Sequence, residues 1–139
     1  MDSAAPYSLV LPSEYLYILL ACVIICIECF LTGIFFVAPA RFGIMNKEHM
    51  AQFKEMHEQA FPGSEPAPGG FPDCGEGRYA EKLSYADWVK FNNAMRVHQN
   101  FIEQLPITLT FLMFSGLFLP KLTMIVGFVY VVARPIYSI

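Results

Sequence analysis

Three long apolar stretches dominate the pattern of this chain, and a polar region rich in proline and glycine separates the first from the second. Apolar residues run from Tyr15 to Ala38, from Leu105 to Leu119 and from Leu122 to Tyr137. A helix needs about 20 residues to cross the hydrocarbon core of a bilayer. The second stretch is shorter than this, so its helix crosses the membrane only if it also includes the residues directly before Leu105. We therefore expect an all-α membrane protein, a transmembrane helical bundle with helices at about 14–38, 84–118 and 122–138 and an extramembrane loop at 42–82.

The composition agrees with a membrane protein. The chain has 139 residues, of which 55% are hydrophobic and only 15% charged. This length predicts a single domain, 1–139. The net charge is −3, whereas nucleic-acid-binding proteins have an excess of positive charge that contacts phosphates, so a nucleic-acid partner is not expected. Cys22, Cys26 and Cys29 recur at helical spacing in an apolar stretch, where small soft residues serve packing, and their spacing does not fit a zinc site.

Local signals set the predicted ends of the helices. Ser13 and Ser84 are candidate N-caps, and Pro39 is expected to end the first helix. The sequence Leu119-Pro120-Lys121 predicts a tight hairpin between the second and third helices. The segment from Arg41 to Lys90 holds six of the nine Lys and Arg residues, so the positive-inside rule places it on the cytoplasmic (or matrix or stromal) side. The protein is thus expected to be an integral, multi-pass membrane protein in contact with membrane lipid.

The region between the first two membrane helices has two parts. Asn46 to Ala60 contains good helix formers and predicts a short surface helix, whereas Phe61 to Gly77 predicts a connector without regular structure. His49 with His57 suggests metal ligands, but nothing completes a coordination set, so no metal site is expected.

A polar stripe directly precedes the second apolar stretch. Arg96, Asn100 and Glu103 have the spacing i, i+4, i+7, which confines them to a strip about 60° wide on an α-helix. Ionisable groups at membrane depth are costly unless they are paired or face water, so we expect either a binding site or a helix end that reaches water. Arg96 and Glu103 are candidates for a pair bridged by Asn100.

Glu28 is the other ionisable residue at membrane depth. It lies among cysteines and phenylalanines in the first apolar stretch. Either it faces protein and finds a partner, or it is protonated. A structural and a functional role both remain open for this residue.

These motifs resemble those of the MAPEG family, membrane-associated proteins of eicosanoid and glutathione metabolism. The resemblance rests on the pattern R-x-x-x-N-x-x-E at Arg96 to Glu103 with Pro106 after it, on Ala40-Arg41, and on the segment Gly127 to Tyr137. Within the family the chain is most similar to the microsomal glutathione transferases of type three. The family pattern has four membrane helices, and three are predicted here.

The resemblance implies a homotrimer that binds glutathione, as co-substrate, between its subunits. It implies conjugation of lipophilic electrophiles or reduction of lipid hydroperoxides, in the endoplasmic reticulum or in an organellar (mitochondrial or plastid) membrane. By motif position it implies a catalytic role for Arg41 and Arg134. It implies glutathione contacts for Arg96, Asn100, Glu103 and Tyr137.

An alternative function follows from two departures from the family pattern. Gln104 stands where relatives often have a tyrosine, and the fourth helix with its tyrosine and arginine is not predicted. The alternative is a catalytically degenerate, MAPEG-like structural subunit of a larger organellar membrane complex. Whether the chain is an enzyme is thus an open question at this point.

Overall fold

A computed structural model describes residues 10–137, and all regular structure in this part of the chain is helical. The chain belongs to the all-α class, as predicted. The helices are α1 (Tyr15–Thr32), the π-helical turn η1 (Gly33–Val37), α2 (Ala38–Ile44), α3 (Lys47–Ala51), α4 (Lys54–Ala60), the short 3-10 turns η2 (Pro68–Gly70) and η3 (Ala80–Lys82), α5 (Tyr85–Phe118) and α6 (Pro120–Tyr137).

The first membrane helix continues beyond its predicted end. The helical path from Tyr15 to Ile44 is unbroken and passes through Pro39, which lies in the first turn of α2. Proline is tolerated in a first turn because its missing N–H is not needed there. The π-helical turn η1 directly before α2 resets the hydrogen-bond register, so Pro39 does not end the helix.

Two helical segments, Tyr15–Ile44 and Tyr85–Phe118, are long and apolar enough to cross a membrane. Only Leu119 separates α5 from α6, which agrees with the tight hairpin expected there. Ser84 caps α5 as predicted, because its Oγ accepts a hydrogen bond from the backbone N–H of Asp87 at 3.1 Å. A membrane-spanning role for α6 stays a prediction, and residue 138 lies outside the described residues.

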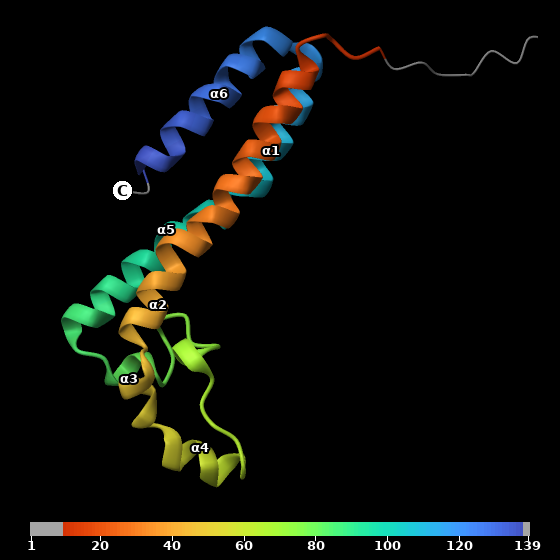
Figure 1. Ribbon diagram of the computed structural model, residues 1–139. Helices are drawn as coiled ribbons and strands as arrows, with labels where there is room; N and C mark the ends of the chain where they lie inside the picture. Colours follow the sequence, from red (N-terminus) through yellow and green to blue (C-terminus); the bar gives the residue numbers. More distant parts are fainter. Residues whose placement is uncertain (1–9, 138–139) are drawn as a thin grey trace, which may run out of the picture. The chain divides into compact units, whose positions relative to one another are not determined.

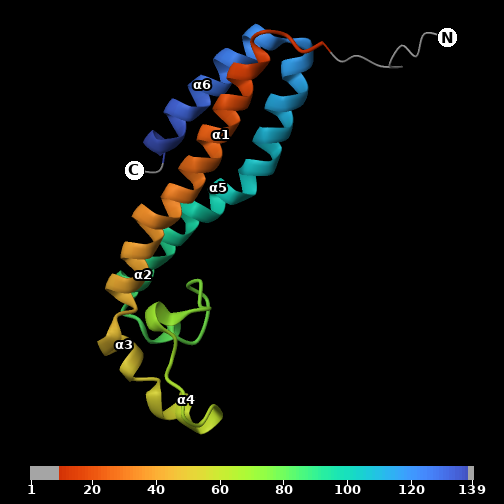
Figure 2. The ribbon, with the colours of Figure 1, turned by 45° about the vertical axis from the view of Figure 1, so that its right-hand side comes forward.

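The described residues form two compact units, one containing 10–28 with 104–137 and the other Cys29–Glu103. In the first unit α1, the second half of α5 and α6 lie side by side (Figures 1 and 2). A Cβ at Gly127 would lie 3.2 Å from Ala21 Cβ, so α6 approaches α1 closely. Small residues permit such close approach of membrane helices.

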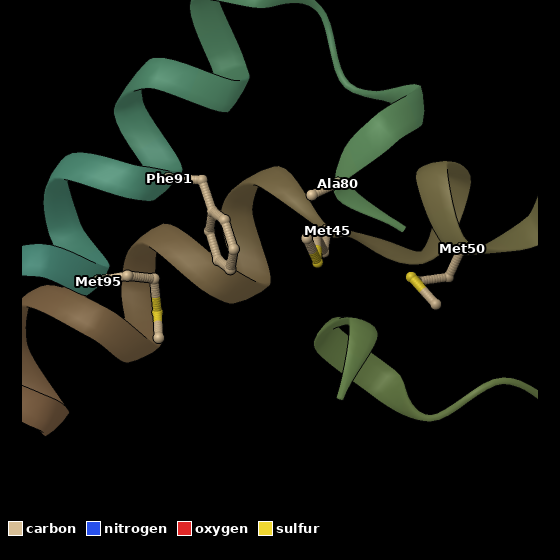
Figure 3. Packing of buried hydrophobic residues seen from close by; sticks show 5 residues of the cluster. All are labelled: Met45, Met50, Ala80, Phe91 and Met95. Carbon is tan, nitrogen blue, oxygen red and sulfur yellow. The ribbon is translucent and has the colours of Figure 1, made fainter. Parts of the chain in front are cut away.

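The second unit has its core where α2, α3, η3 and the first half of α5 meet. The buried cluster consists of Met45, Met50, Ala80, Phe91 and Met95 (Figure 3). Three of these five are methionines, whose flexible side chains fill irregular gaps between short elements. The predicted surface helix at 46–60 is divided in two, α3 and α4, and Phe53 between them is 1% exposed.

The connector after α4 is irregular, as predicted, yet well packed. Gly69 and Gly70 adopt positive φ angles of 71° and 69°, which glycine tolerates better than other residues. Trp88 donates a hydrogen bond from Nε1 to the carbonyl oxygen of Gly75 at 3.0 Å. Trp88 thereby joins the connector to α5, a role that the sequence did not indicate.

Candidate functional site

The predicted polar stripe lies on the first half of α5 and faces away from the chain's own core. Arg96 and Glu103 are exposed, and Asn100 is half-buried. The buried side chains of the same segment, Phe91 and Met95, lie at about 140° and 100° from Arg96 around the helix. The stripe is therefore on the surface that the unit does not cover with its own residues.

His98 confirms this orientation of the helix. Helical periodicity puts it about 160° from Arg96, and the structure places it against η1, where a Cβ at Gly33 would lie 3.4 Å from His98 Cε1. Phe101, about 140° from Arg96, is 1% exposed. Helix α5 thus has one packed face and one open face, and Arg96 belongs to the open one.

The stripe residues are not satisfied by the rest of the described chain. No hydrogen bond or ion pair joins the side chains of Arg96, Asn100 or Glu103 to each other or to other residues between 10 and 137. The expected internal pair of Arg96 and Glu103 is not present in this single chain. Their donors and acceptors are available to a ligand or to a second subunit.

Arg41, predicted to be catalytic, is 2% exposed and is held by residues of its own unit. Its Nη1 donates to the carbonyl oxygen of Gly69 at 3.0 Å, and its Nη2 approaches Met95 Sδ at 3.7 Å. Its guanidinium carbon lies 4.1 Å from the ring centroid of Phe71 and 5.2 Å from that of Phe91. Arg41 therefore meets α5 on its buried face, away from the polar stripe.

Arg134 and Tyr137, the remaining predicted site residues, lie in the last turns of α6. Arg134 is 5% exposed, and its guanidinium carbon lies 5.0 Å from the ring centroid of Tyr137. Tyr137 is exposed. This distance is within the range of a cation–π interaction, so the two residues form one group at the end of the helix.

Sequence reasoning missed Asp73, which organises the connector. Its Oδ1 accepts from the backbone N–H of Gly75 at 2.7 Å and of Gly77 at 2.9 Å, and its Oδ2 accepts from Ala80 at 2.8 Å. Burial by itself raises the pKa of this carboxyl, but these hydrogen bonds outweigh it and the pKa lies below its ordinary value. The spacing Asp-x-Gly-x-Gly is typical of an Asp that turns the chain back on its own side chain.

Two cavities of about 530 and 510 Å³ lie in the second unit. The larger is lined by α4 and by the segment from Pro72 to Tyr79, and the smaller by α2, α3, Lys54 and the segment from Glu65 to Gly69. Neither is lined by the polar stripe. Among residues 10–137, no group of three or more His, Cys, Asp or Glu side chains is arranged to hold a metal ion.

Comparison with known proteins adds one finding. The model of the MAPEG family matches residues 18–139. Comparisons with curated proteins and with solved structures gave no match. The matched region includes all three motifs at Arg41, Arg96–Glu103 and Arg134–Tyr137, and it covers most of the sequence. The chain, with its two long apolar helices and its outward polar stripe, therefore belongs to the MAPEG family of membrane proteins.

Proposed function

We propose that this protein is a membrane-bound, glutathione-dependent transferase or peroxidase that acts on lipophilic electrophiles or lipid hydroperoxides, similar to the microsomal glutathione transferases of type three. MAPEG proteins are generally glutathione-dependent membrane transferases and peroxidases. The observation that carries the proposal is the open face of α5, where Arg96, Asn100 and Glu103 project together without hydrogen-bond or ion-pair partners among residues 10–137.

The chemistry of the stripe suits glutathione. This tripeptide has two carboxylates, one ammonium group and a thiol. The guanidinium of Arg96 matches a carboxylate with two parallel hydrogen bonds, the carboxylate of Glu103 accepts the ammonium group, and the amide of Asn100 serves either partner. The uncovered position of the stripe supports a site that a second subunit of a homotrimer closes.

Activation of the thiol requires a cation, because the thiolate is the reactive form. Arg134, buried beside Tyr137 at the end of α6, is our candidate for this role. The thiol proton passes to water, and the thiolate sulfur bonds to the electrophilic atom while the bond from that atom to its leaving group breaks. With a lipid hydroperoxide the thiolate attacks the outer peroxide oxygen, the O–O bond breaks and the lipid alcohol leaves; a second glutathione then displaces water to give the disulfide. Arg41 is the second candidate, and it reaches a ligand only when its contact with Gly69 is released.

That engagement of Arg41 favours one alternative function. An arginine that is hydrogen-bonded within its own chain stabilises the fold and is not free to contact a substrate. This role fits the alternative function, a structural subunit of an organellar membrane complex. The oligomeric state separates the two proposals. A homotrimer in the endoplasmic reticulum or an organellar membrane supports the enzyme, and a single copy bound to unlike chains supports the structural subunit.

The experiment is a calorimetric titration of the purified protein in detergent with glutathione, with the mass of the assembly measured in parallel. We expect binding to a homotrimer, and we expect Arg96→Ala or Glu103→Gln to weaken it by about tenfold or more, since a hydrogen bond to a charged group contributes about 1.5–3 kcal/mol. Lys90→Ala is the control, because Lys90 is exposed on the same helix outside the stripe. Unchanged affinity in both stripe variants contradicts the site, and a wild-type protein that does not bind glutathione contradicts the function.

A further inference from the structure

The smaller of the two cavities has features of a lipid site that is independent of the glutathione proposal. We name it the juxtamembrane cavity. Its volume of about 510 Å³ is within the range of about 300–1,000 Å³ typical of small-molecule sites. It is lined by apolar and charged residues, among them Phe42, Met45, Met50, Lys47, Lys54 and Glu65.

The cavity lies next to the end of a candidate membrane span. The apolar helical segment that begins at Tyr15 ends at Ile44, and Phe42 in its last turn lines the cavity while remaining 53% exposed. Lys47 begins α3 directly after this helix. The cavity therefore lies at the end of a candidate membrane span, where acyl chains give way to polar headgroups.

The walls of the cavity are formed without a ligand. Arg41 holds the carbonyl of Gly69, a lining residue, at 3.0 Å. Next to it Gly70 packs so closely on Met45 that a Cβ would collide with the Met45 sulfur. Met45 is 0% exposed and Met50 is 6% exposed, so the apolar wall is fixed by the core shown in Figure 3.

The mouth of the cavity carries an excess of positive charge. Lys54 Nζ lies 2.9 Å from Glu65 Oε1, and both side chains are mostly exposed. Lys47 is exposed and lines the same cavity, and Glu65 is the one acidic residue among the lining residues. Lys54 interacts with the carboxylates of Glu65 and Glu58, whereas Lys47 makes no ion pair with residues 10–137. Lys47 is therefore the cation that can receive an anionic group at the mouth of the cavity.

We infer that the juxtamembrane cavity binds an anionic phospholipid, with its phosphate at Lys47 and Lys54 and the upper part of an acyl chain along Phe42, Ala51 and Pro68, the apolar lining residues whose side chains are exposed. The apolar wall accounts for the chain, and the lysine excess accounts for selection of an anionic over a zwitterionic headgroup. The bound lipid joins α2 to α3 and α4. It therefore stabilises the second unit.

The test is native mass spectrometry of the delipidated protein in detergent, titrated separately with phosphatidylglycerol and phosphatidylcholine of identical acyl chains. We expect one phosphatidylglycerol to bind more tightly than phosphatidylcholine. Lys47→Gln should weaken its binding about fivefold and the double variant with Lys54→Gln up to about 30-fold, since each lysine near an anionic lipid contributes about 1 kcal/mol. Lys90→Gln, which removes an exposed lysine outside the cavity, should leave it unchanged.

Filling the cavity provides a second variant that keeps the charges. Ala51 lines the cavity and is exposed, so Ala51→Trp should occupy it without disturbing the core and should abolish the specific binding. Equal affinity for the two lipids, or binding unchanged in Ala51→Trp, overturns the inference. Displacement of the lipid by millimolar glycerol phosphate overturns it as well, because the ligand is then a soluble anion. None of these readouts involves glutathione, so failure here is distinct from failure of the proposed function.

Discussion

Arg41 donates a hydrogen bond from Nη1 to the carbonyl oxygen of Gly69, 28 positions along the chain, at 3.0 Å. The rings of Phe71 and Phe91 lie 4.1 and 5.2 Å from its guanidinium carbon. The guanidinium of Arg41 in α2 thus holds the connector, and among residues 10–137 no carboxylate forms a hydrogen bond or an ion pair with it. Release of the connector is the expected consequence of losing this side chain.

Arg41→Ala should therefore lower the free energy of unfolding of the second unit by about 2–3 kcal/mol. The loss combines a charged hydrogen bond with two cation–π contacts. Arg41→Lys should recover only part of it, because an ammonium does not match the planar guanidinium between the rings. Limited proteolysis of the segment Phe61–Gly77 measures the effect as faster cleavage.

Arg78 offers the matched control for that experiment. It is an exposed arginine of the same connector, and Arg78→Ala should leave the cleavage rate unchanged. Equal cleavage of the Arg41→Ala and wild-type proteins would show that the Gly69 contact does not hold the connector.

Asp73 should make the connector sensitive to acid. Because its pKa in the folded protein lies below the ordinary value, the folded state favours the ionised form. The resulting stability is present above the ordinary pKa of about 4 and is lost as the pH falls through the lower pKa of the folded state. Proteolytic or hydrogen-exchange protection of residues 73–80 should accordingly fall at low pH.

Asp73→Asn should remove that pH dependence and destabilise the connector at neutral pH by about 1–3 kcal/mol. The amide of asparagine has one acceptor oxygen instead of two. If this oxygen accepts from Gly75 and Gly77, the NH2 group faces the N–H of Ala80; if it accepts from Ala80, the hydrogen bonds to Gly75 and Gly77 are lost. Glu76→Gln, at an exposed neighbouring carboxylate, should retain the wild-type profile. An Asp73→Asn protein with that same profile would contradict the role of Asp73.

Close packing of α6 on α1 depends on Gly127. A Cβ there would lie 3.2 Å from Ala21 Cβ and 3.5 Å from Leu112 Cδ2, so Gly127→Ala requires a small shift and Gly127→Leu a large one. We expect Gly127→Leu to destabilise the protein by about 1–3 kcal/mol or more through overpacking. Thermal unfolding in detergent measures this as a lower Tm.

Gly43 is the control glycine for the packing experiment. It lies in α2, and nothing surrounds the position of its Cβ within 4 Å. Gly43→Ala should be neutral or stabilising by about 0.4–1 kcal/mol, because alanine reduces the entropy of the unfolded chain. A Tm that falls as much in Gly43→Ala as in Gly127→Leu would argue against specific packing at Gly127.

Ser84 should contribute to the start of α5. Its Oγ accepts from the N–H of Asp87 at 3.1 Å and donates to the Asp87 carboxylate at 2.7 Å. Ser84→Ala should cost about 0.5–2 kcal/mol, and Ser84→Asn should retain most of the stability. Thermal unfolding distinguishes the two variants, and identical Tm values would contradict a capping role.

The sequence predicted those elements that depend on local signals. The start of α5 follows from the Ser84 cap, and the hairpin follows from Pro120, both of which act within a few residues. The shared face of Arg96, Asn100 and Glu103 follows from helical periodicity alone. Family membership was recognised from the same motifs, and the family model confirms it.

Tertiary structure decided the partners of these residues, because partners far apart in the sequence leave no periodic signal. Only the folded chain shows that the open face of α5 is the one with Arg96, that Arg41 is enclosed by Gly69 and Phe71, and that Asp73 gathers the connector. The continuation of the first helix through Pro39 also required the π-helical turn before it. Periodicity thus determined which residues share a face, whereas burial against distant segments decided which faces are filled and which are left for ligands.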